Sequence, residues 1–113
     1  MRYMLLIYGP ELPPAEYEQA MEDMAPWNAY TDWLREKGIY ESGEPLAPST
    51  SATTVRVRDD QRLTTDGPFA ETKEVLGGYY MIKTDDLDLA LEAAARCPGA
   101  FYGSIEVRPI VET

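Results

Sequence analysis

The stretch Arg2-Tyr3-Met4-Leu5-Leu6-Ile7-Tyr8 is apolar at almost every position and does not alternate with polar residues. A strand with one face in water alternates, whereas a strand covered on both faces is apolar throughout. Tyr79-Tyr80-Met81-Ile82 repeats this pattern later in the chain. We therefore predict that these two segments are the central strands of one sheet, around which the other elements can be placed.

Residues 12–38 carry helical signals on both sides of a proline. Pro13-Pro14 is typical of a helix start, and Lys37-Gly38 is typical of a helix end. Pro26 removes a helical hydrogen bond, so we expect the helix to kink or divide there. The apolar residues at helical spacing are Tyr17, Met21, Met24, Trp27, Tyr30 and Leu34.

Three aromatic residues of the second helical segment allow two interpretations. Trp27, Tyr30 and Trp33 could form a stacking platform for an aromatic ligand. They could equally form the face of the helix that packs against the sheet. We favour packing, because aromatic residues at helical spacing mostly point inward.

Two short alternating segments, Thr53–Arg58 and Gln61–Thr64, predict a β-hairpin with its turn at Asp59-Asp60. The face expected to be apolar contains Val55, Val57 and Leu63. The opposite face is expected to contain Arg56, Arg58 and Arg62. These arginines could bind a small anion, but we favour the interpretation that water solvates them.

The remaining segments complete the set of elements. Ile39–Leu46 is a candidate strand with Gly43 as a bulge, and Ile105–Arg108 alternates as the last strand. Asp85 is the expected N-cap of a final helix. The expected buried stripe of that helix is Leu87, Ala90, Leu91 and Ala94.

The order of these elements predicts one α+β domain over residues 1–113. Without the hairpin, the order is βαββαβ, which is the ferredoxin-like plan, and its first and third strands are central. The helices can cover only one face of the sheet, which leaves the other apolar face exposed. We therefore predict a homodimer in which two such faces pack together across a two-fold axis.

Composition limits the partners of this chain. Its 113 residues include 20 acidic and 10 basic residues, for a net charge of −10. Nucleic acids and anionic membranes are therefore poor partners. The apolar start is too short for a signal peptide and no cleavage site follows it, so we expect a cytoplasmic protein.

Composition also limits the chemistry. The chain has no histidine and one cysteine, Cys97, so we expect neither a disulfide, nor a metal site, nor a cofactor. Without an imidazole to activate it, Cys97 is expected to be a small buried residue instead of a nucleophile.

The segment from Thr64 to Gly78 is the candidate functional loop, because long irregular segments in compact domains are often functional. Asp66 and Glu71 offer carboxylates for acid–base catalysis, and Lys73 offers a cation. Phe69 is expected to anchor the loop on the core. The alternative is a purely structural loop with these charges in water.

The sequence Asp66-Gly67-Pro68-Phe69, followed by Glu71-Thr72-Lys73-Glu74 and Gly77-Gly78-Tyr79-Tyr80, resembles the DGPF domain family within the YCII-related, or YciI-like, proteins. The opening strand, Ala52–Arg56 and Glu106–Ile110 extend the resemblance over nearly the whole chain. The resemblance implies a ferredoxin-like domain of the dimeric α/β-barrel type, in agreement with the fold expected above.

The resemblance implies less about function. Related proteins are associated with a His–Asp pair in a cleft, and this chain has no histidine to supply it. Family members also occur beside sigma factors, which implies a regulatory role. We therefore favour a small-molecule-binding or regulatory module over an enzyme. The binding candidates are Tyr8, Trp27, Tyr30 and Phe69. The alternative is carboxylate acid–base catalysis on a small aromatic or acidic substrate, without histidine or metal.

Overall fold

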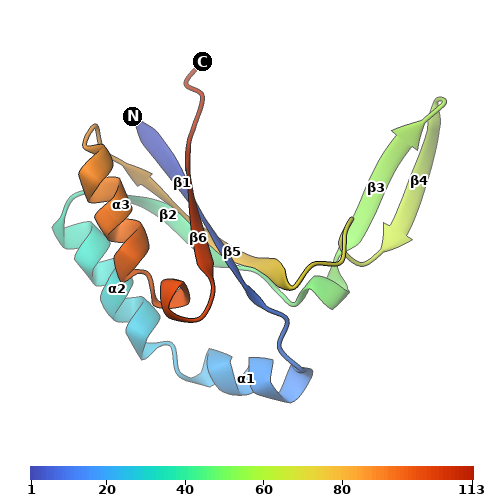
Figure 1. Cartoon of the computed structure of the whole chain (residues 1–113), viewed down its shortest axis with the longest axis horizontal. Helices are drawn as coiled ribbons and strands as arrows, with labels where there is room; N and C mark the ends of the chain where they lie inside the picture. Colours follow the sequence, from blue (N-terminus) through green and yellow to red (C-terminus); the bar gives the residue numbers. More distant parts are fainter.

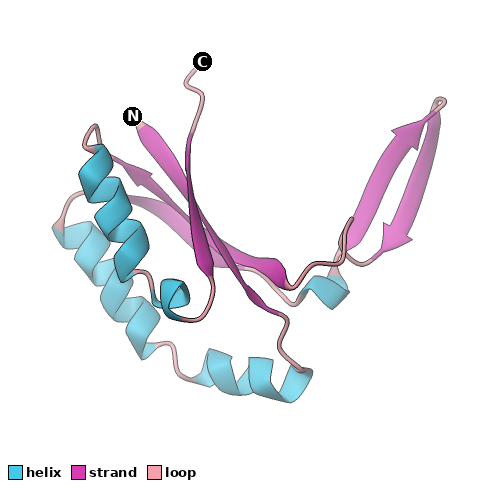
Figure 2. Cartoon of the chain, viewed as in Figure 1, coloured by secondary structure: helices cyan, strands magenta, loops and turns pink.

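A computed structural model describes every residue from Met1 to Thr113 and has the predicted mixed α+β fold (Figure 1). Figure 2 distinguishes the helices from the strands and shows helices on one side of the larger sheet. The elements in chain order are β1 (Arg2–Pro10), α1 (Pro14–Glu22), α2 (Ala25–Glu36), β2 (Tyr40–Pro45), the 3₁₀ turn η1 (Ser49–Ser51), β3 (Thr53–Arg58), β4 (Gln61–Asp66), β5 (Glu74–Lys83), α3 (Leu87–Arg96), the 3₁₀ turn η2 (Pro98–Phe101) and β6 (Ser104–Pro109).

Four antiparallel strands form the main sheet in the order β2-β5-β1-β6. β1 and β5 are thus the two central strands, as their uninterrupted apolar sequences predicted. β3 and β4 form a separate two-stranded sheet, and neither sheet closes into a barrel. All of the helices fall short of the length and apolarity that a membrane span requires.

The core lies between the main sheet and the helices α2 and α3. Tyr3, Leu5 and Ile7 of β1 have exposed fractions of 5%, 0% and 9%. Because side chains of a strand alternate between its faces, these three share the face that the helices cover. The rest of the core is Tyr30, Leu34, Ile39, Tyr80, Ile82, Ala90, Ala93, Ala94 and Cys97.

The opposite face of the main sheet carries no helix (Figure 1). Met4, Leu6 and Tyr8 of β1 and Tyr79 and Met81 of β5 lie on it, and each is partly exposed. An apolar surface of this kind therefore remains uncovered in the single chain, and it is called the open face below.

Pro26 divides the helical segment, as predicted. α1 ends at Glu22, and α2 begins at Ala25 with Pro26 in its first turn. A proline at this position costs no hydrogen bond, because the first N–H groups of a helix have no partner within the helix.

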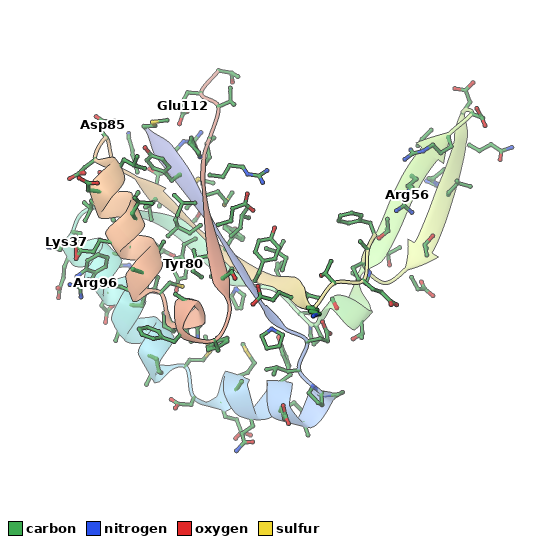
Figure 3. All side chains as sticks on the ribbon, in the orientation of Figure 1. Lys37, Arg56, Tyr80, Asp85, Arg96 and Glu112 are labelled. Carbon is green, nitrogen blue, oxygen red and sulfur yellow. The ribbon has the colours of Figure 1, made fainter.

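The N-cap of α3 differs from the prediction. Asp86, and not Asp85, caps the helix, since its carboxylate accepts a hydrogen bond of 3.2 Å from the backbone N–H of Leu89. Asp85 instead binds the ammonium group of Met1 at 2.7 Å (Figure 3).

The buried stripe of α3 also differs from the prediction. Leu87 and Leu91 are 52% and 49% exposed, whereas Ala90, Ala93 and Ala94 are buried. Small side chains on the inner face let the helix approach closely, so the alanines point inward and the two leucines point to water.

The hairpin β3-β4 forms as predicted, with Asp59-Asp60 both at positive φ in its turn. The predicted faces were correct for the β3 residues but wrong for Arg62 and Leu63 of β4. The two-residue loop sets a register that pairs Val57 with Arg62 and Arg56 with Leu63. Directly paired residues of antiparallel strands point to the same face. Leu63 therefore shares a face with Arg56, and Arg62 shares a face with Val57.

The predicted loop from Thr64 to Gly78 is mostly strand. β4 continues to Asp66, which pairs with Thr53, and β5 begins at Glu74. Only residues 67–73 lie outside the strands, and Gly67 turns the chain there with a φ of 90°.

Gly43 has a different role from the predicted one. The irregularity of β2 lies between Tyr40 and Ser42, and pairing at Gly43 is regular. A Cβ at Gly43 would lie 2.7 Å from Cδ1 of Tyr80, which is too close for any side chain. The glycine therefore makes room for the Tyr80 ring, which forms part of the site described next.

Candidate functional site

The helix α1 stands apart from the helical layer, beside the end of the sheet at which β1 leaves it (Figure 1). None of its residues is buried. Its apolar residues Tyr17, Ala20 and Met21 nevertheless lie on one side at helical spacing, and Met24 follows them in the segment before α2. This side faces an open cavity of about 210 Å³ instead of a packed core.

The cavity lies between α1, the ends of β1 and β5, and the segment after β2. Most of its wall is apolar. Its principal apolar and aromatic lining residues are Ile7, Leu12, Tyr17, Met21, Met24, Trp27, Leu46, Val75, Tyr80 and Tyr102. No lysine or arginine lines it, whereas Glu11 and Glu44 do.

Trp27 and Tyr80 form an aromatic wall between the cavity and the core. Their rings are stacked with an interplanar angle of 6° and centroids 6.4 Å apart. The Tyr80 hydroxyl is 2.7 Å from the Thr31 hydroxyl, which also donates to the Trp27 carbonyl at 3.0 Å. Burial raises the pKa of Tyr80, although the hydrogen bond with Thr31 opposes this shift. The wall is therefore neutral at physiological pH.

The polar groups of the cavity lie at its rim. Ser49 donates a hydrogen bond of 2.6 Å to Glu11, which ties the chain after β1 to the turn after β2. The Tyr17 hydroxyl donates to the Leu46 carbonyl at 3.4 Å, so α1 is also tied to that turn. The rim is thus acidic and partly hydrogen-bonded, and the interior is apolar.

The YCII-related domain model matches residues 1–113 of the chain. The chain belongs to the YCII-related domain family. It is also 37% identical over 117 residues to an uncharacterized protein of Rhizobium meliloti (strain 1021). That similarity covers 97% of this chain and 92% of the relative.

The charged candidates of this YCII-related domain lie outside the cavity. Asp66, Glu71 and Lys73 are all exposed, and none of them lines the cavity wall. No group of three or more cysteine, aspartate or glutamate side chains is placed to hold a metal ion. A catalytic role for these residues remains a prediction from the sequence.

Phe69 does not anchor its loop on the core, contrary to the prediction. Its side chain is 78% exposed, and only its backbone carbonyl is held, by a 3.3 Å hydrogen bond from Arg56. Residues 67–73 of the loop lead from the base of the hairpin back to β5, and Figure 3 shows Arg56 far from Tyr80.

The aromatic binding candidates have separate environments. Trp27 lines the cavity, whereas Tyr8 lies on the open face of the sheet. Tyr30 is a core residue, 5% exposed, and its hydroxyl donates to the Ala93 carbonyl at 2.6 Å. The Arg96 guanidinium lies 4.7 Å from the centre of the Trp33 ring. The preferred interpretation, that this helix face packs inward, is therefore confirmed for Tyr30. Trp27 packs against the edge of the core and also lines the cavity.

Sequence reasoning missed most of the cavity. The signal for the α1 side was present, because Tyr17, Met21 and Met24 recur at helical spacing, but the same spacing is typical of a core face. Leu46 and Tyr102 carry no local signal at all. They meet in the cavity only because β1, the segment after β2 and η2 converge at one end of the sheet.

Proposed function

We propose that this YCII-related domain binds a small, uncharged and mainly apolar molecule in the cavity beneath α1. The observation that carries the proposal is the apolar side of α1, which faces an open cavity although apolar helix faces normally pack against a core. A cavity of about 150 Å³ accommodates benzene in other proteins. The volume here, about 210 Å³, suits a single aromatic ring with small substituents.

The chemistry of the wall supports an aromatic ligand without a negative charge. Trp27 and Tyr80 offer ring faces, and the sulfur atoms of Met21 and Met24 interact favourably with aromatic rings. A carboxylate in this cavity would be desolvated with no cation to compensate it. Among the substrate classes expected from the sequence, the aromatic class is therefore favoured over the acidic class.

Binding is favoured over catalysis for the same cavity. Acid–base catalysis needs a titratable group within hydrogen-bonding reach of the substrate. The carboxylates at the cavity lie at its rim, and Glu11 already accepts a hydrogen bond from Ser49. Asp66 and Glu71 stand on the exposed loop, away from the wall.

We also infer that the domain is ferredoxin-like and dimerises through its open face. The strand order β2-β5-β1-β6 supports the ferredoxin-like plan, in which the first and third strands of βαββαβ are central. Only 14 of the 113 residues are buried, which is few for a domain that folds as a monomer. A second copy packed on Met4, Leu6 and Tyr79 would supply the missing burial.

The DGPF resemblance implies regulation of a sigma factor. In that case, ligand binding by this domain would control its association with the sigma factor. A pull-down with a sigma factor, performed with and without the ligand, tests this link. Partner retention that depends on the ligand is the expected result, and equal retention under both conditions would contradict it.

The binding proposal is tested by calorimetric titration at neutral pH with p-cresol and with 4-methylbenzoate, which differ mainly in charge. We expect p-cresol to bind and the benzoate to bind at least about tenfold more weakly. Ala20→Phe fills the cavity and should abolish binding. Ala15→Phe places the same side chain on α1 outside the cavity lining and should leave binding unchanged. Equal binding to both variants would refute the proposed site.

A further inference from the structure

The hairpin β3-β4 forms an arm that projects from the domain body (Figure 1). Its strands pair only with each other. The arm is held at its base, where the Gly67 N–H donates to the Ala52 carbonyl at 2.6 Å and the Thr54 hydroxyl donates to the Gly67 carbonyl at 2.8 Å. A compact domain of this length has a radius of gyration of about 13 Å, whereas this chain has 15.9 Å.

One face of the arm exposes apolar side chains to water. Val55 and Val57 lie on it with exposed fractions of 57% and 61%, beside Thr64 and Arg62 of the paired strand. An isolated two-stranded ribbon is marginally stable in water, and both of its edges are open to further pairing. The arm therefore has the features of an element whose packing partner lies outside its own chain.

The charges favour a second copy of this chain as that partner. Three arginines of the arm, Arg56, Arg58 and Arg62, balance three aspartates at its tip and base. Those aspartates are Asp59, Asp60 and Asp66. The remainder of the chain therefore carries the entire net charge of −10. Arg62 shares the face of Val55 and Val57 and can therefore meet a carboxylate on the acidic body of another copy, whereas Arg56 and Arg58 lie on the opposite face.

The geometry leads to the same partner. Figure 1 shows the arm on the side of the main sheet opposite α2 and α3, so that the arm and the open face border one wide space. In a two-fold dimer that joins two open faces, each arm projects alongside the other copy.

We propose that each arm clasps the second copy, with Val55 and Val57 buried against it and Arg62, which shares their face, close to its acidic surface. This inference rests on the dimer proposed above. It adds a second contact area, which makes the dimer depend on residues distant from the open face.

The test combines light scattering over a dilution series with hydrogen exchange of the wild-type chain. Arm amides should be protected only at concentrations where the dimer forms, because a lone ribbon opens readily. Val57→Asp should raise the dissociation constant of the dimer about tenfold or more, since it removes one buried side chain. Leu63→Asp changes a leucine on the opposite face of the same arm and should have an effect of about twofold or less.

Three outcomes would overturn the inference, and they differ in what else they contradict. A dimer whose arm amides exchange freely contradicts the clasp and leaves the open-face dimer standing. A larger effect of Leu63→Asp than of Val57→Asp contradicts the assigned face. A chain that stays monomeric at every concentration contradicts both the clasp and the dimer.

Discussion

At the scale of single residues, Cys97 is the clearest case of a side chain whose role could be predicted from the sequence. It is 0% exposed, and burial raises the pKa of its thiol from 9.0 to about 11. The sequence predicted a small buried residue instead of a nucleophile, because the chain has no histidine to activate a thiolate. The thiol is therefore protonated and part of the core.

The Cys97 pKa predicts a pH dependence of stability. The unfolded thiol loses its proton near pH 9 and the folded thiol near pH 11, so its stabilising contribution is complete below about pH 9 and is lost as the pH rises. Between about pH 8 and about pH 10, the wild type should lose about 1 kcal/mol more stability than Cys97→Ala. Urea unfolding of both proteins at each pH measures this difference, and parallel pH profiles would contradict the shifted pKa.

Single residues of the candidate site were harder to predict. Asp66, Glu71 and Lys73 were chosen for their chemistry, but chemistry does not tell which side of a sheet or arm a residue will occupy. The hairpin register places Asp66, and the path of residues 67–73 places Glu71 and Lys73, and none of the three lines the cavity. Trp27, a binding candidate because it is aromatic, lies near the start of α2 and lines the cavity.

At the scale of the elements, the N-cap of α3 shows where local signals become ambiguous. Asp85 and Asp86 both suit an N-cap by residue type. The choice depends on a tertiary contact, since the Met1 ammonium binds Asp85 at 2.7 Å and Asp86 is left to cap the helix. Nothing near Asp85 in the sequence indicates that contact.

The two aspartates provide a matched pair of substitutions. Asp86→Ala removes the hydrogen bond to the Leu89 N–H and should lower the free energy of unfolding by about 1 kcal/mol. Asp85→Ala removes only an exposed ion pair and should have a much smaller effect. Thermal unfolding monitored by circular dichroism compares the two. A larger loss for Asp85→Ala would mean that the cap is assigned to the wrong residue.

Most elements could be predicted because their signals are local. Proline placed the ends of α1 and α2, and alternation placed the hairpin strands. The faces of the hairpin were predicted wrongly because they follow from the register that a two-residue turn imposes. The inward face of α3 was predicted correctly for Ala90 and Ala94 and wrongly for Leu87 and Leu91, because alanines and leucines on a short helix fit more than one orientation.

At the scale of the whole molecule, the decisive feature is a helix face that does not pack. The sequence correctly indicated an amphipathic segment before Pro26, and such a segment normally covers a core. Here the core is already closed by α2 and α3, and α1 lies beyond the end of the sheet, facing a cavity (Figure 1). Only the placement of all elements together distinguishes a cavity wall from a core face.

The five methionines offer the most direct test of the binding proposal. Met21 and Met24 line the cavity, whereas Met4 and Met81 pair on the open face. Chemical shifts of isotope-labelled methionine methyl groups can therefore report both surfaces during one titration with p-cresol. At a fixed protein concentration, we predict that the ligand shifts the signals of Met21 and Met24 and leaves those of Met4 and Met81 unchanged. Shifts confined to Met4 and Met81, with Met21 and Met24 unmoved, would contradict a binding site beneath α1.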